Sequence, residues 1–269
     1  MQIDFDFRGH HVFVFGGTTG INFGVAQAFA RQGADLTVAS RKPENVESAC
    51  TQLAKFGGRV HGVCADVRDF DAVGRAFTEG VERFGPIDTL VSGAAGNFLC
   101  EAKEMSSNGF RAVVDIDLIG TFHVLRQAHA HLRKPGAAVI NITAPQSYVP
   151  MRYQAHACAA KAGVDQLTRV LALEWGGEGI RINSVSPGPI DGTEGFRKLM
   201  APTDAKRAAA ISAVPLQRFG SLDDIANLVL FLASPYASYI SGALIPCDGG
   251  GALESVKPAL ETAGRSAAG

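Results

Sequence analysis

The sequence predicts an α/β fold: one doubly wound domain in which a seven-stranded parallel sheet is flanked by helices on both faces. Seven short β-rich runs alternate with longer amphipathic segments along the chain, as in repeated strand–helix–strand units. The runs are apolar throughout rather than alternating, which is typical of strands covered on both faces. A glycine-rich turn directly follows the first run, where a parallel α/β unit must bend sharply into its helix.

The elements can be assigned in order from these patterns. The expected strands are HVFVFG (11–16), DLTVAS (35–40), RVHGVC (59–64), IDTLVSG (87–93), AAVINIT (137–143), IRINSVS (180–186) and GALIPCDGG (242–250). The expected helices are GVAQAFARQG (24–33), ENVESACTQLAKFG (44–57), DAVGRAFTEGVERFG (71–85), the long segment Ser106–Arg133 and KAGVDQLTRVLALEWGGEG (161–179). Gly33, Gly57, Gly85 and Gly176 are the predicted helix stops.

The chain shows no linker and no internal repeat, so residues 1–253 are expected to form a single domain. Between about 189 and 215 the strand–helix alternation breaks, and this stretch is a candidate lid over a binding site. Residues 254–269 form an Ala-, Gly- and Ser-containing tail that we expect to be partly disordered.

Composition narrows the class of protein. Hydrophobic residues make up 46% of the chain and the net charge is -1, which favours neither nucleic acid nor a membrane surface as a partner. The five cysteines are scattered without a Cys-x-x-Cys pair, so we expect no metal site and a reducing, cytoplasmic location. No apolar run is long enough to cross a bilayer, and the acidic N-terminus is unlike a signal peptide.

The glycine-rich turn predicts a dinucleotide site. Backbone N–H groups at a helix N-terminus bind a pyrophosphate, and glycines let it approach closely. An NAD site places an acid at the end of the second strand, but this strand ends with Ser40, Arg41 and Lys42, while Asp35 lies at its opposite end. Arg41 can make a two-pronged contact with a 2′-phosphate, so NADP(H) is the predicted cofactor.

Further motifs resemble the short-chain dehydrogenase/reductase family, which has a Rossmann-type fold. Gly16 and Gly20 match its glycine motif, whereas Phe15 and Asn22 replace its threonine and last glycine. The turn SGAAG from Ser92 resembles its Asn-Asn-Ala-Gly turn, and SPGPI (186–190) resembles the turn that faces the nicotinamide. The cofactor-binding residues that this resemblance implies are Gly16, Thr18, Thr19, Gly20, Ile21, Ser40, Arg41, Asp66, Val67, Ala94, Lys161, Pro187, Gly188 and Ile190.

The catalytic residues that the family uses for carbonyl chemistry are mostly absent. The family places Tyr one helical turn before Lys, and Ser about thirteen residues before that Tyr. Anchored on Lys161, these positions are Ala157 and Ala144, and the family's Asn position is Asp117. A ketone reduction needs a positioned acid, whereas reduction of a conjugated thioester spreads its charge into a dienolate, and water can supply the proton to carbon.

The amino-acid sequence around these positions resembles that of 2,4-dienoyl-CoA reductases, and among them the peroxisomal type. The resemblance extends over roughly residues 5–253. That resemblance implies NADPH-dependent reduction of 2,4-dienoyl-CoA to 3-enoyl-CoA in unsaturated fatty-acid degradation, with Lys161, Asp117 and Asp248 as catalytic residues. It implies that Asn97 and Phe98 line the acyl site. It also implies a homotetramer that packs through the helices at 106–133 and 153–176. The chain ends GRSAAG without a peroxisomal address, which favours a bacterial cytoplasmic version.

Two alternatives remain open at this stage. Tyr148 or Tyr153 can replace the missing acid in a reductase of another thioester or of a ketone. The chain can instead be a catalytically silent NADP(H)-binding protein, because intact cofactor motifs beside two alanines suit a retired enzyme as well.

Overall fold

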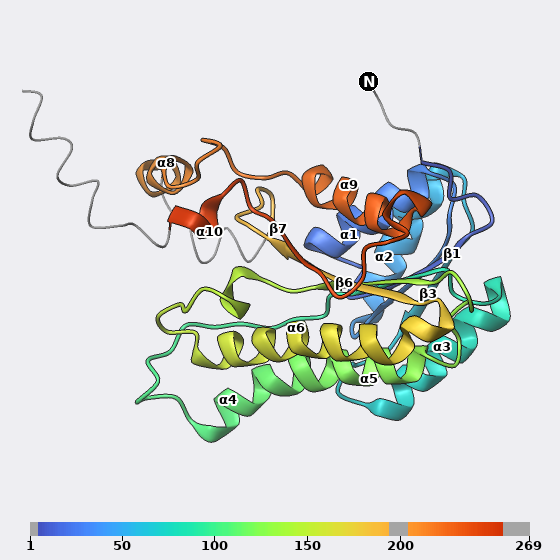
Figure 1. The fold of residues 1–269 in the computed structure, drawn as a ribbon, viewed down its shortest axis with the longest axis horizontal. Coiled ribbons are helices and arrows are strands. Elements are labelled where there is room, and N and C mark those ends of the chain that lie inside the picture. Colours follow the sequence, from blue (N-terminus) through green and yellow to red (C-terminus); the bar gives the residue numbers. More distant parts are fainter. Residues whose placement is uncertain (1–4, 194–203, 255–269) are drawn as a thin grey trace, which may run out of the picture.

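A computed structural model of the chain describes residues 5–193 and 204–254. Seven strands form one parallel sheet in the order β3-β2-β1-β4-β5-β6-β7, which confirms the predicted fold class (Figure 1). The strands are β1 (His11–Phe15), β2 (Asp35–Ser40), β3 (Val60–Cys64), β4 (Thr89–Ser92), β5 (Ala138–Ile142), β6 (Arg181–Pro187) and β7 (Leu244–Cys247).

Helices cover both faces of the sheet and explain why its central strands are apolar throughout. The helices of the described residues are α1 (Gly20–Arg31), α2 (Pro43–Leu53), α3 (Phe70–Phe84), α4 (Ser107–Val114), α5 (Gly120–Ala128), α6 (Ala155–Trp175), α8 (Asp204–Ser212), α9 (Leu222–Ala233) and α10 (Gly251–Glu254). Successive β1 side chains alternate between two cores: Val12 and Val14 pack with α1, α2 and α9, while Phe13 and Phe15 pack with α3, α5 and α6.

The strand order places a binding crevice at the carboxyl ends of the central strands β1 and β4. The chain runs outward from β1 to β2 and β3, then returns to pair β4 with the other side of β1. At such a reversal the loops after β1 and β4 diverge, and a crevice opens at the carboxyl ends of the strands. The glycine-rich turn follows β1 and the SGAAG turn follows β4, so both lie at this crevice.

Two helix predictions need correction. The uninterrupted helix expected over 106–133 is wrong: α4 and α5 are joined by η2 (Asp115–Ile119), a π-helical turn, and α5 ends at Ala128. Gly120 N–H bonds back to Asp115 O, five residues earlier, and a Cβ on Gly120 would lie 2.6 Å from Val67. The second correction is α9, which was not among the expected helices although it packs directly on α1.

The predicted helix stops at Gly33, Gly57 and Gly85 are confirmed, because each follows its helix with a positive φ that favours glycine. Gly176 follows α6 with right-handed φ, and Gly179 takes the left-handed turn instead. The candidate lid lies partly outside the described residues, which stop at 193 and resume at 204. Nearly all of the predicted tail, from 255 onward, also lies outside them.

Candidate active site

A cavity of about 650 Å³ opens where β1 and β4 end, at the predicted crevice. Twelve of the predicted site residues line it, and they come from seven different segments of the chain. These residues are Gly16, Thr19, Ile21, Ser40, Arg41, Val67, Ala94, Asn97, Asp117, Lys161, Pro187 and Gly188. The structure therefore brings together most of a site that is spread along the sequence from residue 16 to residue 188.

The remaining predicted residues lie beside the cavity rather than in its wall: Thr18, Gly20, Asp66, Phe98, Ile190 and Asp248. Thr18 and Ile190 are buried, and Gly20 is the first residue of α1. Asp66 is held by Arg68, whose guanidinium donates to both carboxylate oxygens and lowers the pKa of that carboxyl. The cofactor contact expected of Asp66 therefore has to compete with this ion pair.

The glycine-rich turn forms a cradle with room for a phosphate group. Gly16 has φ +76, and a Cβ there would approach Ala94 N to 3.0 Å. Gly16 N–H donates to Ala39 O, which fixes the turn against β2. The N-cap of α1, Thr19, lines the cavity and makes no side-chain cap bond, so its side chain does not satisfy the helix's first N–H groups. These features fit a dinucleotide pyrophosphate.

The end of β2 carries positive charge and no acid. Ser40, Arg41 and Lys42 line the cavity, and within the described residues Arg41 makes no hydrogen bond or ion pair. Asp35 begins the same strand at its other end, where Arg59 donates to both of its oxygens. An adenosine ribose at this strand end would therefore meet a guanidinium rather than a carboxylate.

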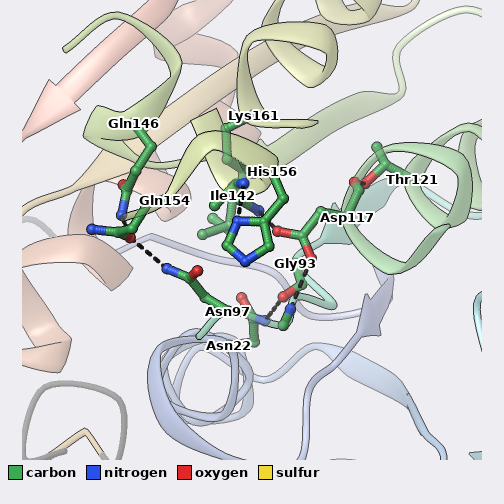
Figure 2. Close-up of polar contacts among 12 residues, drawn as sticks. Asn22, Gly93, Asn97, Asp117, Thr121, Ile142, Gln146, Gln154, His156 and Lys161 are labelled. Carbon is green, nitrogen blue, oxygen red and sulfur yellow. Dashed lines mark hydrogen bonds and ion pairs between the residues drawn. The ribbon is translucent and has the colours of Figure 1, made fainter. Parts of the chain in front are cut away.

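A buried ion pair forms the floor of the cavity (Figure 2). Lys161 Nζ lies 3.2 Å from Asp117 Oδ2, and their side chains are 8% and 2% exposed. Lys161 also donates to Ile142 O at 3.4 Å, while Gly96 N–H donates to Asp117 Oδ1 at 2.7 Å. The π-helical turn η2 carries Asp117, and Thr121 Oγ1 donates to its carbonyl oxygen. The carboxylate thus positions both the lysine and the SGAAG turn.

No tyrosine lines this cavity within the described residues. Ala144 and Ala157 do line it, so the positions that carry Ser and Tyr in carbonyl-reducing relatives of the resembled family end in methyl groups. Tyr148 OH is bonded to Ser186 Oγ at 3.1 Å, and partial burial raises its pKa. Tyr153 is half exposed and has φ +66. Neither tyrosine occupies the vacated place.

His156 is buried on α6, and its environment is unusual. Its Nδ1 accepts the Ala157 N–H at 2.8 Å, and its buried Nε2 has no partner in the described part of the chain. Phe98 stands edge-on to the ring with centroids 4.4 Å apart, and Phe98 does not line the cavity. Asn97 does line the cavity, where its amide donates to Gln154 Oε1 (Figure 2).

Asp248 lies at the start of α10 rather than in the cavity wall. Its two oxygens accept the N–H groups of Gly250 and Ala252, both at 2.9 Å. It also packs behind the cavity, because a Cβ on Gly188 would lie 2.5 Å from Asp248 Cα. Asp248 therefore stabilises the turn after β7 and supports the Pro187–Gly188 segment, whatever else it does.

Sequence reasoning missed several residues of the wall. Asn45, Gly96 and Thr143 line the cavity. Asn22 lines it too, although the sequence marks it only as the residue that replaces the last glycine of the motif. Thr143 directly follows β5, so the rule that sites form at carboxyl ends of parallel strands could have found it. Asn45 lies on α2 and had no readable signal.

Three further findings concern metal binding, membrane spans and disulfides. Among the described residues, no group of three or more His, Cys, Asp or Glu side chains is arranged to hold a metal ion. No helix in that part of the chain is both long and apolar enough to span a membrane. All five cysteines are unpaired.

A doubly wound parallel sheet with a glycine cradle at its reversal point and a buried lysine in the same cavity defines a Rossmann-type, nicotinamide-dependent oxidoreductase. The chain belongs to the short-chain dehydrogenase/reductase family, because the family model described as enoyl-(acyl carrier protein) reductase matches residues 16–252. The resemblance expected from the sequence is confirmed.

Curated relatives and solved structures support this family assignment. The chain is 45% identical over 245 residues to the peroxisomal 2,4-dienoyl-CoA reductase [(3E)-enoyl-CoA-producing] of Pongo abelii, covering 90% of this chain and 84% of that one. It is 39% identical over 242 residues to the probable 2,4-dienoyl-CoA reductase [(2E)-enoyl-CoA-producing] of Bacillus subtilis, covering 89% and 95%. A short chain dehydrogenase from Bacillus anthracis superposes with a TM-score of 0.80 at 35% identity, covering 90% and 96%.

Proposed function

We propose that this chain uses NADPH to reduce 2,4-dienoyl-CoA thioesters to 3-enoyl-CoA in the degradation of unsaturated fatty acids. One observation carries the proposal: the cavity keeps the Lys161–Asp117 pair but presents Ala144 and Ala157 where a carbonyl reductase needs hydroxyl groups. The names of the relatives in Pongo abelii and Bacillus subtilis support the substrate class.

The vacant acid position discriminates between substrates. Hydride addition to a ketone leaves an alkoxide, which needs a proton delivered to oxygen as the bond forms. Hydride addition to C5 of a dienoyl thioester leaves a dienolate whose charge is shared with the thioester oxygen. Such an oxygen needs hydrogen bonds or a nearby cation rather than a proton. The ammonium of Lys161 supplies that positive potential from the cavity floor.

The bound cofactor supplies the hydride, and the chain's own residues hold the reactants. A C–H bond forms at C5, the electron pair of the C4–C5 double bond moves to C3–C4, and that of C2–C3 moves onto the thioester. An O–H bond of water then breaks: its proton bonds to C2, hydroxide is released to solvent, and the double bond stays at C3–C4. We assign the placement of that water to the carboxylate of Asp117, which lines the cavity and retains a second lone pair beside its present hydrogen bond. We propose Asp248 as the second carboxylate of the site, which acts from behind the wall by holding the Pro187–Gly188 segment.

The preference for NADPH over NADH follows from the end of β2. Arg41 lines the cavity, and the acid that feels its charge, Asp66, is already bonded to Arg68, which suits contact of Arg41 with a 2′-phosphate. On the acyl side, Asn97 lies in the cavity wall, and Phe98 lies next to it against His156. We propose these two residues as the border of the acyl chain.

The relocated-acid alternative has weaker support. Tyr148 already bonds Ser186, and neither Tyr148 nor Tyr153 lines the cavity in the described residues. No specific observation favours a catalytically silent protein either, because the Lys161–Asp117 pair that we propose for dienoyl reduction is present on the cavity floor.

Assembly and compartment belong to the same proposal. A face formed by α4, η2, α5 and α6 exposes Phe110, Ile119, Phe122, Val170 and Leu173. Ala155, Ala159 and Ala162 on α6 are exposed as well, which permits close approach of another helix. We propose that this face packs between subunits of a homotetramer. The five unpaired cysteines support a reducing cytoplasm.

A substrate panel tests the function. The purified protein is assayed for NADPH oxidation with 2,4-hexadienoyl-CoA, with acetoacetyl-CoA and with no acyl substrate. We expect rapid oxidation with the dienoyl thioester and near-background oxidation with the ketone. Efficient reduction of acetoacetyl-CoA would establish a relocated acid, and NADPH binding without turnover of either substrate would establish a silent protein.

A further inference from the structure

Asn22 occupies a place where the resembled glycine motif has no side chain at all. It is the third residue of α1, is 8% exposed and lines the cavity. Its Nδ2 donates to Gly93 O at 2.7 Å, so α1 is tied to the turn that follows β4 (Figure 2). This bond fixes the orientation of the amide, because the reverse orientation would set two acceptor oxygens against each other.

The other end of the same amide is left without a partner. Asn22 Oδ1 is buried and accepts no hydrogen bond from any described residue. A buried carbonyl oxygen without a donor destabilises a protein, and a glycine at this position would avoid that loss. The side chain is also tightly confined, since a Cβ on Gly93 would lie 2.3 Å from Oδ1 and one on Gly16 would lie 3.1 Å from Nδ2. Because less than 1 Å² of this oxygen is accessible, a donor that arrives with a ligand satisfies it together with a small shift of the amide or of the turn at Gly93.

The position of Oδ1 selects the kind of donor. The phosphates of a dinucleotide are acceptors and are repelled by a carbonyl oxygen. The adenosine 2′-phosphate is expected beside Arg41, and the nicotinamide beside Pro187 and Gly188, both on other segments of the wall. Asn22 lies between Gly16 and Gly93, where the chain of sugars and phosphates must cross from one side to the other. The donors of that portion are ribose hydroxyl groups.

We propose that Asn22 Oδ1 accepts a hydrogen bond from a ribose hydroxyl of the bound NADPH, while Nδ2 holds the turn at Gly93 in place. Asn22 is then a cofactor-binding residue that couples α1 and the turn after β4 to the occupancy of the cavity. The inference rests on the proposed function only in taking NADPH as the ligand; it does not depend on the acyl substrate.

The test is a binding cycle measured by calorimetry without any acyl substrate. Wild type, Asn22→Gly and Asn22→Ala are titrated with NADPH and with analogues that each lack one ribose hydroxyl: the adenosine 3′-hydroxyl, or the 2′- or 3′-hydroxyl of the nicotinamide ribose. For one analogue, wild type should bind about 2- to 12-fold more weakly than NADPH, the range of one net hydrogen bond. Both variants should bind that analogue and NADPH equally. Titration with 2′,5′-ADP shows which ribose is involved, because it carries only the adenosine ribose.

The controls separate this inference from other failures. Thermal unfolding without ligand reports the loss of the Nδ2–Gly93 bond, and Asn22→Ala guards against the weak helix propensity of glycine. If every analogue loses the same factor in wild type and in both variants, Asn22 touches no hydroxyl and the inference is wrong. If wild type binds no NADPH at all, the cofactor assignment fails instead.

Discussion

The buried pair at the cavity floor makes the sharpest prediction, because stability and catalysis should respond to it differently. Asp117→Asn keeps the shape of the side chain and an oxygen that can accept the Gly96 N–H. It removes the charge that lies 3.2 Å from Lys161 Nζ. At an effective dielectric constant of about 20, that separation corresponds to an attraction of about 5 kcal/mol.

The expected losses follow from burial. Both side chains are more than nine-tenths buried, and removing one partner of such a pair typically costs about 3 to 5 kcal/mol. Urea unfolding of Asp117→Asn should show a loss in this range. Its kcat for 2,4-hexadienoyl-CoA should fall about 10²- to 10⁴-fold, the range for a group that positions a proton transfer. The Kd for NADPH should change little.

The double variant Asp117→Asn/Lys161→Met distinguishes the two roles. With both charges removed, no buried charge is left unpaired, so most of the lost stability should return. Activity should stay low and NADPH binding should weaken, since Lys161 is proposed to act on both the ribose and the dienolate. A fully active Asp117→Asn would show that the carboxylate only positions its neighbours, and our proton route would be wrong.

Three other predictions concern the cofactor, pH and assembly. Arg41→Ala should weaken NADPH binding about 10- to 150-fold more than NADH binding, because a charged hydrogen bond contributes about 1.5 to 3 kcal/mol. Calorimetry measures both affinities, and equal weakening of the two cofactors would overturn the NADP(H) assignment. Burial lowers the pKa of His11 below its ordinary 6.5, so the unfolded chain binds more protons than the folded chain and the free energy of unfolding should fall as pH drops from about 7 to 5. His11→Gln should flatten this slope in urea titrations at several pH values. An unchanged slope would rule out His11 as its source. Leu173, 85% exposed on α6, should matter for assembly: light scattering should give a tetramer for wild type and smaller species for Leu173→Lys, whereas a monomeric wild type at micromolar concentration would refute the assembly.

The strands were predictable because a covered parallel sheet requires apolar runs. The run DLTVAS coincides with β2, and the other strands begin and end within two residues of their predicted limits, except that β7 ends three residues early, at Cys247. The helix α9 was missed, although Ser221 and Asp224 form a capping box directly before its apolar segment, and that signal is readable. The π-helical turn was not readable, because it shifts the apolar face by one residue without any punctuating Gly or Pro inside it.

The site shows the same division between what is local and what is long-range. Motif positions placed Gly16, Arg41 and Lys161 in one cavity, because each follows from its own strand or helix. Contacts between distant segments could not be derived from spacing. The tie from Asn22 to Gly93 and the ring of Phe98 against His156 depend on how the loops pack above the sheet.

The most direct measurement of the account is the position of the new hydrogens in the product. Wild type would be incubated with NADPH carrying deuterium at the transferred position and 2,4-hexadienoyl-CoA, and in a second reaction with unlabelled NADPH in D₂O. The thioester products would be examined by NMR. We predict 3-hexenoyl-CoA with cofactor-derived deuterium on C5 in the first reaction and solvent-derived deuterium on C2 in the second. A 2-hexenoyl-CoA product with solvent deuterium on C4, or no product at all, would contradict the proposed reaction.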